Sequence, residues 1–231
     1  MPRRQPSMRE LLADPAAYWH AAAVPEREGV RPVVAMSRQP GARGGELARV
    51  LGRKLGLQVF DREIIHRIAE SAHSSDRVVA VLDEKERSLL TEWLMSLSPD
   101  APLSSYGYFE HLTHVVASIA RLGGAVILGR GAHLILRPGQ ALRVMVVAPL
   151  EERVRTVARR EGIDLHEAQR LVAAQEAERH AFLKHYFRAN SDDQTCFDLV
   201  VNTSVLGLEE AAEVLASALV RLPAGLPAGH P

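Results

Sequence analysis

Five short, nearly continuous hydrophobic runs punctuate the chain, and each has the length and composition of a strand that is covered on both faces. These runs are VVAM from Val33, LQVF from Leu57, AVIL from Ala125, RVMVVA from Arg143 and DLVVN from Asp198. Apolar residues at helical spacing predict helices over 44–55, 62–71, 109–122, 150–160, 165–187 and 208–219. Strands that alternate with helices predict βαβ units and an α/β fold with a mostly parallel sheet.

The segments around this alternating pattern predict the domain organisation. Residues 1–31 read as an N-terminal extension and residues 32–222 as one domain, because 231 residues suffice for one sizeable core. The stretch 74–123 is too long for a simple crossover, and we expect it to hold an insertion on the substrate side. The tail 223–231, PAGLPAGHP, has the composition of a disordered segment.

Composition and charge argue against several classes of function. With 28 basic and 28 acidic residues the formal net charge is zero, so nothing indicates a chain-wide surface for nucleic acid or an anionic membrane. No apolar stretch approaches the ~20 residues that span a bilayer, and the charged start lacks a following apolar segment. Cys196 is alone, which rules out an internal disulfide. We therefore expect a soluble, cytoplasmic protein whose anion-binding surface is local.

The stretch SRQPGARGGE, residues 37–46, joins the first predicted strand to the first predicted helix. Its glycines permit backbone angles at which several amides point together at a phosphate, near the positive end of the helix. The pattern G-x-x-x-x-G-K-[ST] does not match, because no lysine follows a glycine and Glu46 stands where a magnesium-binding hydroxyl is expected. From spacing alone, a phosphate loop and a purely structural turn both remain open.

Two further strand ends carry candidate ligands. Asp61 and Arg62 follow the second predicted strand, where an acid can hydrogen-bond a sugar or base and an arginine can clamp a phosphate. The alternative for Asp61 is a helix cap. Gly129 and Arg130 follow the third predicted strand, where a guanidinium suits a bidentate grip on phosphate.

The predicted helices over 150–160 and 165–187 are rich in basic residues. For any one of these side chains, a solvated position paired with glutamate at helical spacing is the simpler interpretation. As a group beside a phosphate loop they would form a mobile cationic lid. The residues in question are Arg153, Arg155, Arg159, Arg160, Arg170, Arg179 and Lys184.

The order of these motifs resembles the cytidylate kinase-like family, relatives of bacterial cytidylate kinase within the P-loop nucleoside monophosphate kinases. The resemblance runs from about residue 33 to residue 219. It is carried by MSRQPGARGGELARVLGRKLGLQVFDREII, AVILGRGAHLIL, RVMVVAPLEERV, EAERHAFLKHYF and FDLVVNTSVLGLEEA. It implies a three-layer P-loop NTPase-type fold around a five-stranded parallel sheet, with a helical substrate-binding insertion and a lid at about 161–190. It also implies transfer of the γ-phosphoryl group of ATP to CMP or dCMP, with Mg²⁺.

The resemblance also implies roles for particular residues. The cradle for the ATP phosphates is formed by Ser37, Arg38, Gly41, Ala42, Arg43, Gly44, Gly45 and Glu46. The acceptor is bound by Asp61, Arg62, Gly129 and Arg130. Charge on the transferring group is neutralised by the catalytic residues Arg130, Arg153, Arg179 and Arg43, of which Arg179 follows Glu176 in a lid-like pattern. Magnesium is expected at Ser37 and Glu46. The expected partners are small-molecule nucleotides, with neither nucleic acid nor membrane, and a homodimer stays open.

The loop departs from the pattern G-x-x-G-x-G-K-[GS]-T of true cytidylate kinases. Arg38 replaces the first glycine, Arg43 the third, Gly44 the lysine and Glu46 the threonine. The kinase-like branch commonly reads S-R-x-x-G-x-G-G-R-E, from which Arg43 and Gly45 still differ. Either Arg38 or Arg43 would then supply the missing positive charge.

These departures keep two rival functions open. One is a catalytically silent nucleotide-binding sensor or regulatory module, which the missing lysine and threonine favour. The other is a kinase for another small acceptor, selected by the 74–123 segment. In that segment Tyr106, Tyr108 and Phe109 could stack on a base or serve only as packing.

Overall fold

The computed structural model describes residues 31–62 and 123–221, together with Phe109 and residues 112–113, 115–117 and 119–120. The predicted extension before Arg31, the predicted helix after Arg62, most of the 74–123 segment and the tail from residue 222 lie outside the described residues. The predictions for Tyr106 and Tyr108 therefore stay untested.

The described strands form one parallel sheet of five strands in the order β2-β3-β1-β4-β5. The predicted α/β class is confirmed, and every strand lies on one of the five hydrophobic runs. β1 occupies the centre, with β3 and β4 on either side, so the loops that follow these three strands meet at one edge. The strands are β1 (Val33–Arg38), β2 (Gln58–Phe60), β3 (Ala125–Leu128), β4 (Leu142–Val147) and β5 (Leu199–Asn202).

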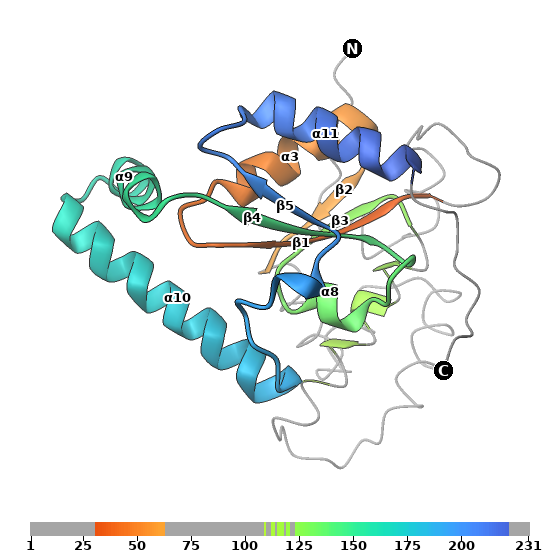
Figure 1. The fold of residues 1–231 in the computed structure, drawn as a ribbon, viewed down its shortest axis with the longest axis horizontal. Helices are drawn as coiled ribbons and strands as arrows, with labels where there is room; N and C mark the ends of the chain where they lie inside the picture. The colour runs from red at the N-terminus through yellow and green to blue at the C-terminus, as the bar shows by residue number, and fades with distance from the viewer. Residues whose placement is uncertain are drawn as a thin grey trace, which may run out of the picture.

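Helices cover both faces of the sheet (Figure 1). On one face α3 (Gly44–Leu55) and α11 (Leu208–Arg221) bury Leu47, Leu51 and Leu215 against the sheet. The opposite face is covered by the described part of the predicted 109–122 helix, whose helical residues bury Leu112, Val116 and Ile119. The short α8 (Ala132–Ile135), which the sequence pattern did not predict, packs on this same face.

Two further helices stand at the edge of the sheet where β1 and β4 end (Figure 1). α9 (Leu150–Glu161) and α10 (Leu165–Phe187) pack on each other through Val154, Val157, Ala168 and Val172. The Asp164 carboxylate caps α10 by accepting a hydrogen bond from the Glu167 amide at 2.8 Å. No helix within the described ranges is both long and apolar enough to cross a membrane.

Candidate active site

The loop that follows β1 is held against the end of β4. The Gln39 amide donates to the Val146 carbonyl at 3.0 Å, and the Gln39 Oε1 accepts from the Ala148 amide at 3.2 Å. Gly41 has φ +82°, and a Cβ on it would overlap the carbonyl oxygen of Arg153 at the start of α9. Only glycine fits this position, because both the backbone angle and the available space exclude a side chain.

The start of α3 carries an ion pair that the sequence pattern did not indicate. Arg43 is the N-cap of α3 and adopts a left-handed backbone conformation with φ 59°. Its guanidinium donates to the Glu46 carboxylate, with Nη2 and Nε at 2.9 and 3.2 Å from Oε2. This ion pair brings together two predicted phosphate-site residues of opposite charge at the helix start, and both side chains are partly exposed.

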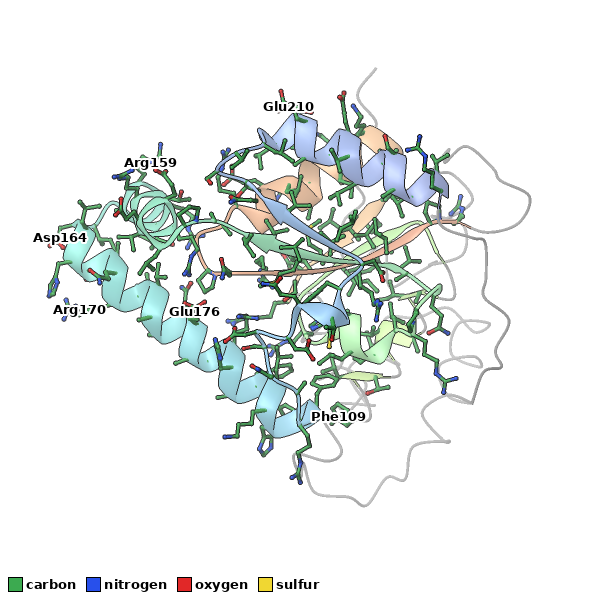
Figure 2. The ribbon with its side chains drawn as sticks, in the orientation of Figure 1. Phe109, Arg159, Asp164, Arg170, Glu176 and Glu210 are labelled. Carbon is green, nitrogen blue, oxygen red and sulfur yellow. The ribbon has the colours of Figure 1, made fainter. Side chains whose placement is uncertain are left out.

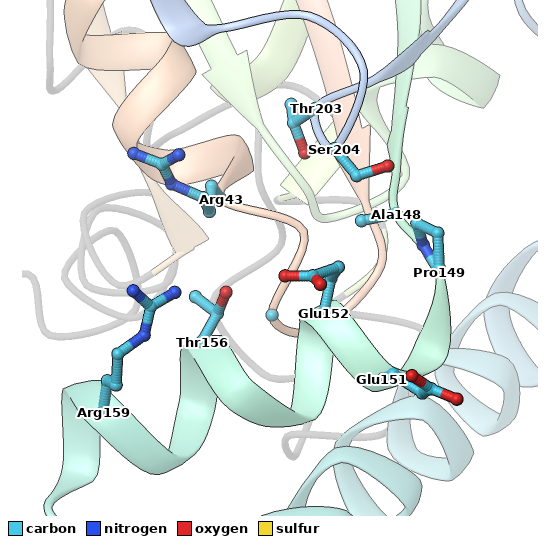
Figure 3. Close-up of a pocket in the computed structure, with 10 residues that line it drawn as sticks. Arg43, Ala148, Pro149, Glu151, Glu152, Thr156, Arg159, Thr203 and Ser204 are labelled. Carbon is cyan, nitrogen blue, oxygen red and sulfur yellow. The ribbon is translucent and has the colours of Figure 1, made fainter.

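A cavity of about 550 Å³ opens beside this loop (Figure 3). This volume lies in the range typical of small-molecule sites. Its wall combines the loop, one side of α9 from its first to its last turn, and the segment after β5. The lining residues are Gly41, Arg43, Ala148, Pro149, Glu151, Glu152, Thr156, Arg159, Thr203 and Ser204. The Thr203 hydroxyl donates to the Ala42 carbonyl at 2.9 Å and thereby fixes one side of the loop.

The predicted lid arginines differ in their surroundings. Arg155 pairs with Glu152 at 2.6 Å and with Glu151 at 3.4 Å, and Arg160 pairs with Glu161, all on exposed positions of α9. The two pairs of Arg155 follow the simpler interpretation of solvated ion pairs at helical spacing, and the pair of Arg160 with Glu161 is a solvated contact between adjacent residues. Arg159, in contrast, lines the cavity (Figure 3).

A second set of arginines gathers on the β3 side of the loop. The Arg38 guanidinium extends toward Gly129 at the end of β3. Burial, together with the charges of Arg62, Arg130 and Arg179, lowers the pKa of Arg38 to about 10. Among the described residues whose charges act on it, Asp61 alone opposes this shift. The structure thus brings together the acceptor residues predicted at the ends of β2 and β3. It adds Arg38, which the sequence assigned to the ATP cradle.

Arg130 lies in a tight turn that α10 covers. Gly129, Arg130 and Gly131 all have positive φ, at 85°, 52° and 69°. The Arg130 Cζ lies 5.2 Å from the centroid of the Phe182 ring, and the Phe187 ring occupies the space that a Cβ on Gly131 would fill.

An aromatic cluster at the C-terminal end of α10 completes this contact. Phe109 stacks on Tyr186 with ring centroids 5.9 Å apart and meets Phe187 edge-on at 5.1 Å. Phe182 packs on Tyr186 at 4.9 Å. Figure 2 shows Phe109 beside the end of the helix. Sequence reasoning missed this cluster, although the aromatic residues of HAFLKHYF were the available signal.

Arg179 and Arg153 occupy neighbouring but unlike environments. The Arg179 side chain is 15% exposed, and its Nη1 donates to the Ser191 carbonyl at 3.4 Å. Its Nε and Nη2 are buried and have no hydrogen-bond acceptor among the described residues. Arg153 is buried too, but its Nε donates to the Ala148 carbonyl at 3.1 Å and its Nη1 to Glu176 Oε2 at 3.2 Å. Arg153 therefore links α9 to α10, whereas two guanidinium nitrogens of Arg179 have no acceptor among the described residues.

His133 is a buried residue of this region that the sequence did not single out. Its ring stacks on Phe197 with centroids 4.5 Å apart. Burial lowers the pKa of His133 to about 4, and the nearby charges of Arg179 and Arg143 lower it in the same direction. The imidazole is therefore neutral at physiological pH. Arg143 itself is paired with Asp198, whose carboxylate also accepts from the Arg143 amide at 2.8 Å.

Comparison with known proteins identifies the family. The sequence model of the cytidylate kinase-like family matches residues 33–205. The chain belongs to this family. Among its relatives, a cytidylate kinase from Ignicoccus hospitalis is 28% identical over 184 residues, which are 79% of this chain and 96% of the relative. A cytidylate kinase from Aeropyrum pernix is 26% identical over 180 residues, covering 78% of this chain and 94% of the relative.

A solved structure supports the fold independently. An uncharacterised protein from Eubacterium ventriosum superposes with a TM-score of 0.61 at 14% identity, covering 83% of this chain and 99% of that one. The family match confirms the predicted family and, with it, the P-loop kinase fold. It also confirms that the protein is an enzyme of the nucleoside monophosphate kinase type. The roles of individual residues stay predictions.

Proposed function

We propose that the protein transfers the γ-phosphoryl group of ATP to a nucleoside monophosphate, with CMP or dCMP as the acceptor. The observation that carries this proposal is that the charges of Arg62, Arg130 and Arg179 all act on the buried guanidinium of Arg38, next to a glycine-containing loop that follows the central strand. Several cations that face one another repel, and a polyanionic ligand would relieve that repulsion. Kinship with cytidylate kinases supports the choice of acceptor.

The two sides of the β1 loop suit two different nucleotides. On one side lies the 550 Å³ cavity, bordered by Gly41, Arg43 and Thr203, which is the expected place of ATP. On the other side lie Arg130 and Arg62 with Asp61, which is the expected place of the acceptor. In parallel α/β sheets ligands bind beyond the carboxyl ends of the strands, and both sides satisfy this rule.

The chemistry requires positioning and charge stabilisation rather than a general base. An oxygen of the acceptor's phosphate attacks the γ-phosphorus of ATP, the bond between that phosphorus and the bridging oxygen breaks, and ADP leaves with the electron pair. The acceptor phosphate is already an anion, so no proton has to be removed from it. Arg62 and Arg130 would orient the acceptor, and the buried donors of Arg179 would bind the developing charge.

Arg153 fits a positioning role in the described arrangement. Its contacts with Ala148 and Glu176 hold the start of α9 and the middle of α10 in register. The prediction that Arg153 also contacts the transferring group is not tested by these contacts. Figure 2 shows Glu176 midway along α10.

The donor oxygens at the loop fit a magnesium ion that arrives with the nucleotide. Magnesium commonly takes one or two protein carboxylates and fills its remaining positions with phosphate and water oxygens. Glu46 is partly exposed at the start of α3 and would be the protein ligand, whereas Ser37 is buried in β1. No cluster of three or more acidic, histidine or cysteine side chains occurs in the part of the chain that the structure describes. When bound, magnesium would neutralise charge on the ATP phosphates.

The test is an ADP-release assay with purified protein, ATP and magnesium against CMP, dCMP, UMP, AMP, GMP and no acceptor. We expect release that depends on CMP or dCMP and falls about 10- to 1000-fold in Arg130→Ala. Arg53→Ala removes an exposed arginine at the far end of α3 and is the matched control. ATP binding without turnover on any acceptor would favour the silent nucleotide-binding module. Turnover with an acceptor other than CMP or dCMP would favour the second rival.

The remaining predictions stand unchanged beside this proposal. These are a cytoplasmic location, nucleotide partners without nucleic acid or membrane, and an open question of a homodimer. The lid at about 161–190 would include α10, whose C-terminal end already contacts the turn that holds Arg130.

A further inference from the structure

Arg38 stands where phosphate loops of cytidylate kinases carry a glycine, and its side chain runs from the end of β1 toward the end of β3. Two glycines leave space for it. A Cβ on Gly44 would lie 2.6 Å from the Arg38 Cβ and 3.0 Å from its Cγ. A Cβ on Gly129 would overlap the Arg38 Nη1. The stem of Arg38 therefore fills the space beside position 44, and its head fills the space beside position 129.

Position 44 is the place of the missing lysine. Any side chain there would meet the Cβ and Cγ of Arg38, which are fixed to the strand and cannot swing aside like the end of a side chain. The neighbouring Gly45 is different, because a Cβ on it would approach only Leu128 Cδ2 at 3.8 Å, an ordinary contact. This backbone therefore cannot accommodate a lysine at position 44 together with an arginine at position 38.

The charges that act on the head of Arg38 are mostly positive among the described residues. Arg62, Arg130 and Arg179 all act on its charge, and Asp61 is the one opposing group among the described residues that does so. Arg38 stays protonated at neutral pH, because its pKa of about 10 is still well above 7. Among the described residues, three arginines and one acid act on the charge of Arg38, so positive charge predominates around its guanidinium. Glu176 and Asp192 oppose the charge of Arg179.

We propose that Arg38 is a catalytic residue that replaces the lysine of the phosphate loop, contacting the transferring phosphoryl group from the end of β1. The three positions are then sterically coupled, because the side chain of Arg38 occupies the space that side chains at Gly44 and Gly129 would need. The catalytic part rests on the proposed function, whereas the steric coupling does not. Arg43, which pairs with Glu46 on the cavity side, would instead contact the donor nucleotide.

The steric coupling is tested by thermal unfolding of two alanine substitutions, each in the wild-type and in an Arg38→Gly background. Gly44→Ala should lower Tm by about 2–12 °C, the usual range for overpacking in a domain of this size. In an Arg38→Gly background the same substitution should cost nothing. Gly45→Ala is the matched control and should leave Tm unchanged in both backgrounds. A Gly44→Ala cost that is absent, or that is equal in both backgrounds, would overturn the coupling.

The catalytic role is tested by binding and turnover. Calorimetry with ATP, CMP and inorganic pyrophosphate should show at least about a tenfold loss of pyrophosphate and CMP affinity in Arg38→Gly. The double variant Arg38→Gly with Gly44→Lys moves the charge to the usual position and should regain at least about tenfold in ATP affinity and turnover over Arg38→Gly. Arg53→Ala should match the wild type throughout. Unchanged affinities and turnover in folded Arg38→Gly, or no regain in a folded double variant, would overturn this role.

The two proposals fail in different ways. A wild-type protein that turns over no acceptor contradicts the proposed kinase function. The pyrophosphate affinities would still decide whether Arg38 binds phosphate, and the Tm comparison would still decide the steric coupling. A wild-type protein that phosphorylates CMP while Arg38→Gly does so equally well contradicts only the role of Arg38.

Discussion

Arg153 and Arg179 should respond in opposite directions when their charge is removed. The Arg153 guanidinium has two protein acceptors, the Ala148 carbonyl at 3.1 Å and Glu176 at 3.2 Å. Arg179 has one long hydrogen bond to Ser191 at 3.4 Å and a distant exposed carboxylate, Asp192, at 3.8 Å. Burial lowers the pKa of Arg179, and the carboxylates of Glu176 and Asp192 offset this effect only in part.

The magnitudes follow from these contacts. Methionine keeps most of the apolar length of arginine and removes the head. A buried donor without an acceptor costs about 1–3 kcal/mol, and Arg179→Met removes such donors. The substitution also removes the weak contacts with Ser191 and Asp192, so the net increase in the free energy of unfolding should be roughly 1–2 kcal/mol. Arg153→Met leaves Glu176 and a carbonyl without their donor and should lower it by about 1–3 kcal/mol. The latter figure lies below that of fully buried pairs because Glu176 is 26% exposed.

The assay is thermal unfolding at pH 7 without nucleotide, followed by ADP release with ATP and CMP. The two methionine variants should differ in Tm by about 4–20 °C, with Arg179→Met the more stable. Turnover by Arg179→Met should nevertheless fall about 100- to 1000-fold, because the variant lacks the guanidinium donors that would bind the transferring group. An Arg179→Met protein that is less stable than the wild type, or that keeps full activity, would refute this reasoning.

Two further predictions concern neighbouring positions. His133 has a pKa of about 4 in the folded protein against 6.5 ordinarily, so the unfolded chain binds more protons between these values and stability falls as pH falls through that window. The loss between pH 7 and pH 5 should be about 2 kcal/mol in urea unfolding, and His133→Phe, which keeps a ring against Phe197, should lack it; an unchanged pH slope would contradict the burial of a neutral imidazole. Gly41→Ala should lower stability by roughly 2–5 kcal/mol and weaken ATP binding, because it forces a Cβ into the Arg153 carbonyl at a left-handed backbone position. A Gly41→Ala protein with wild-type Tm and ATP affinity would show that the loop can move away from α9.

Local signals were sufficient to predict most of the secondary structure. The bounds of α10 agree with the sequence pattern, because Asp164 caps its first turn and the helical spacing of apolar residues continues to Phe187. β1 runs two residues further than its hydrophobic run, to Arg38, since parallel pairing with β4 continues as far as Val146. The short α8 was missed, because four residues carry too little periodicity to stand out.

The roles of the predicted site residues stay predictions, and their geometry could not be predicted. The hydrophobic runs placed Arg62 and Arg130 after the second and third predicted strands, and the structure shows these strands to be neighbours in the sheet. Nothing along the chain indicates that Arg38 turns toward Gly129 or that Arg43 pairs with Glu46, because side-chain direction depends on which space distant residues leave empty. The same holds for the aromatic residues at the end of α10, whose partners lie far away in the sequence.

The central claim is that the protein phosphorylates CMP with ATP, and formation of CDP measures this most directly. Purified protein should be incubated with ATP, CMP and magnesium, and the nucleotides separated by anion-exchange chromatography. The account predicts CDP and ADP in equal amounts, with formation lost in Arg130→Ala and retained in Arg53→Ala. Absence of CDP from a folded protein that binds both ATP and CMP would contradict it.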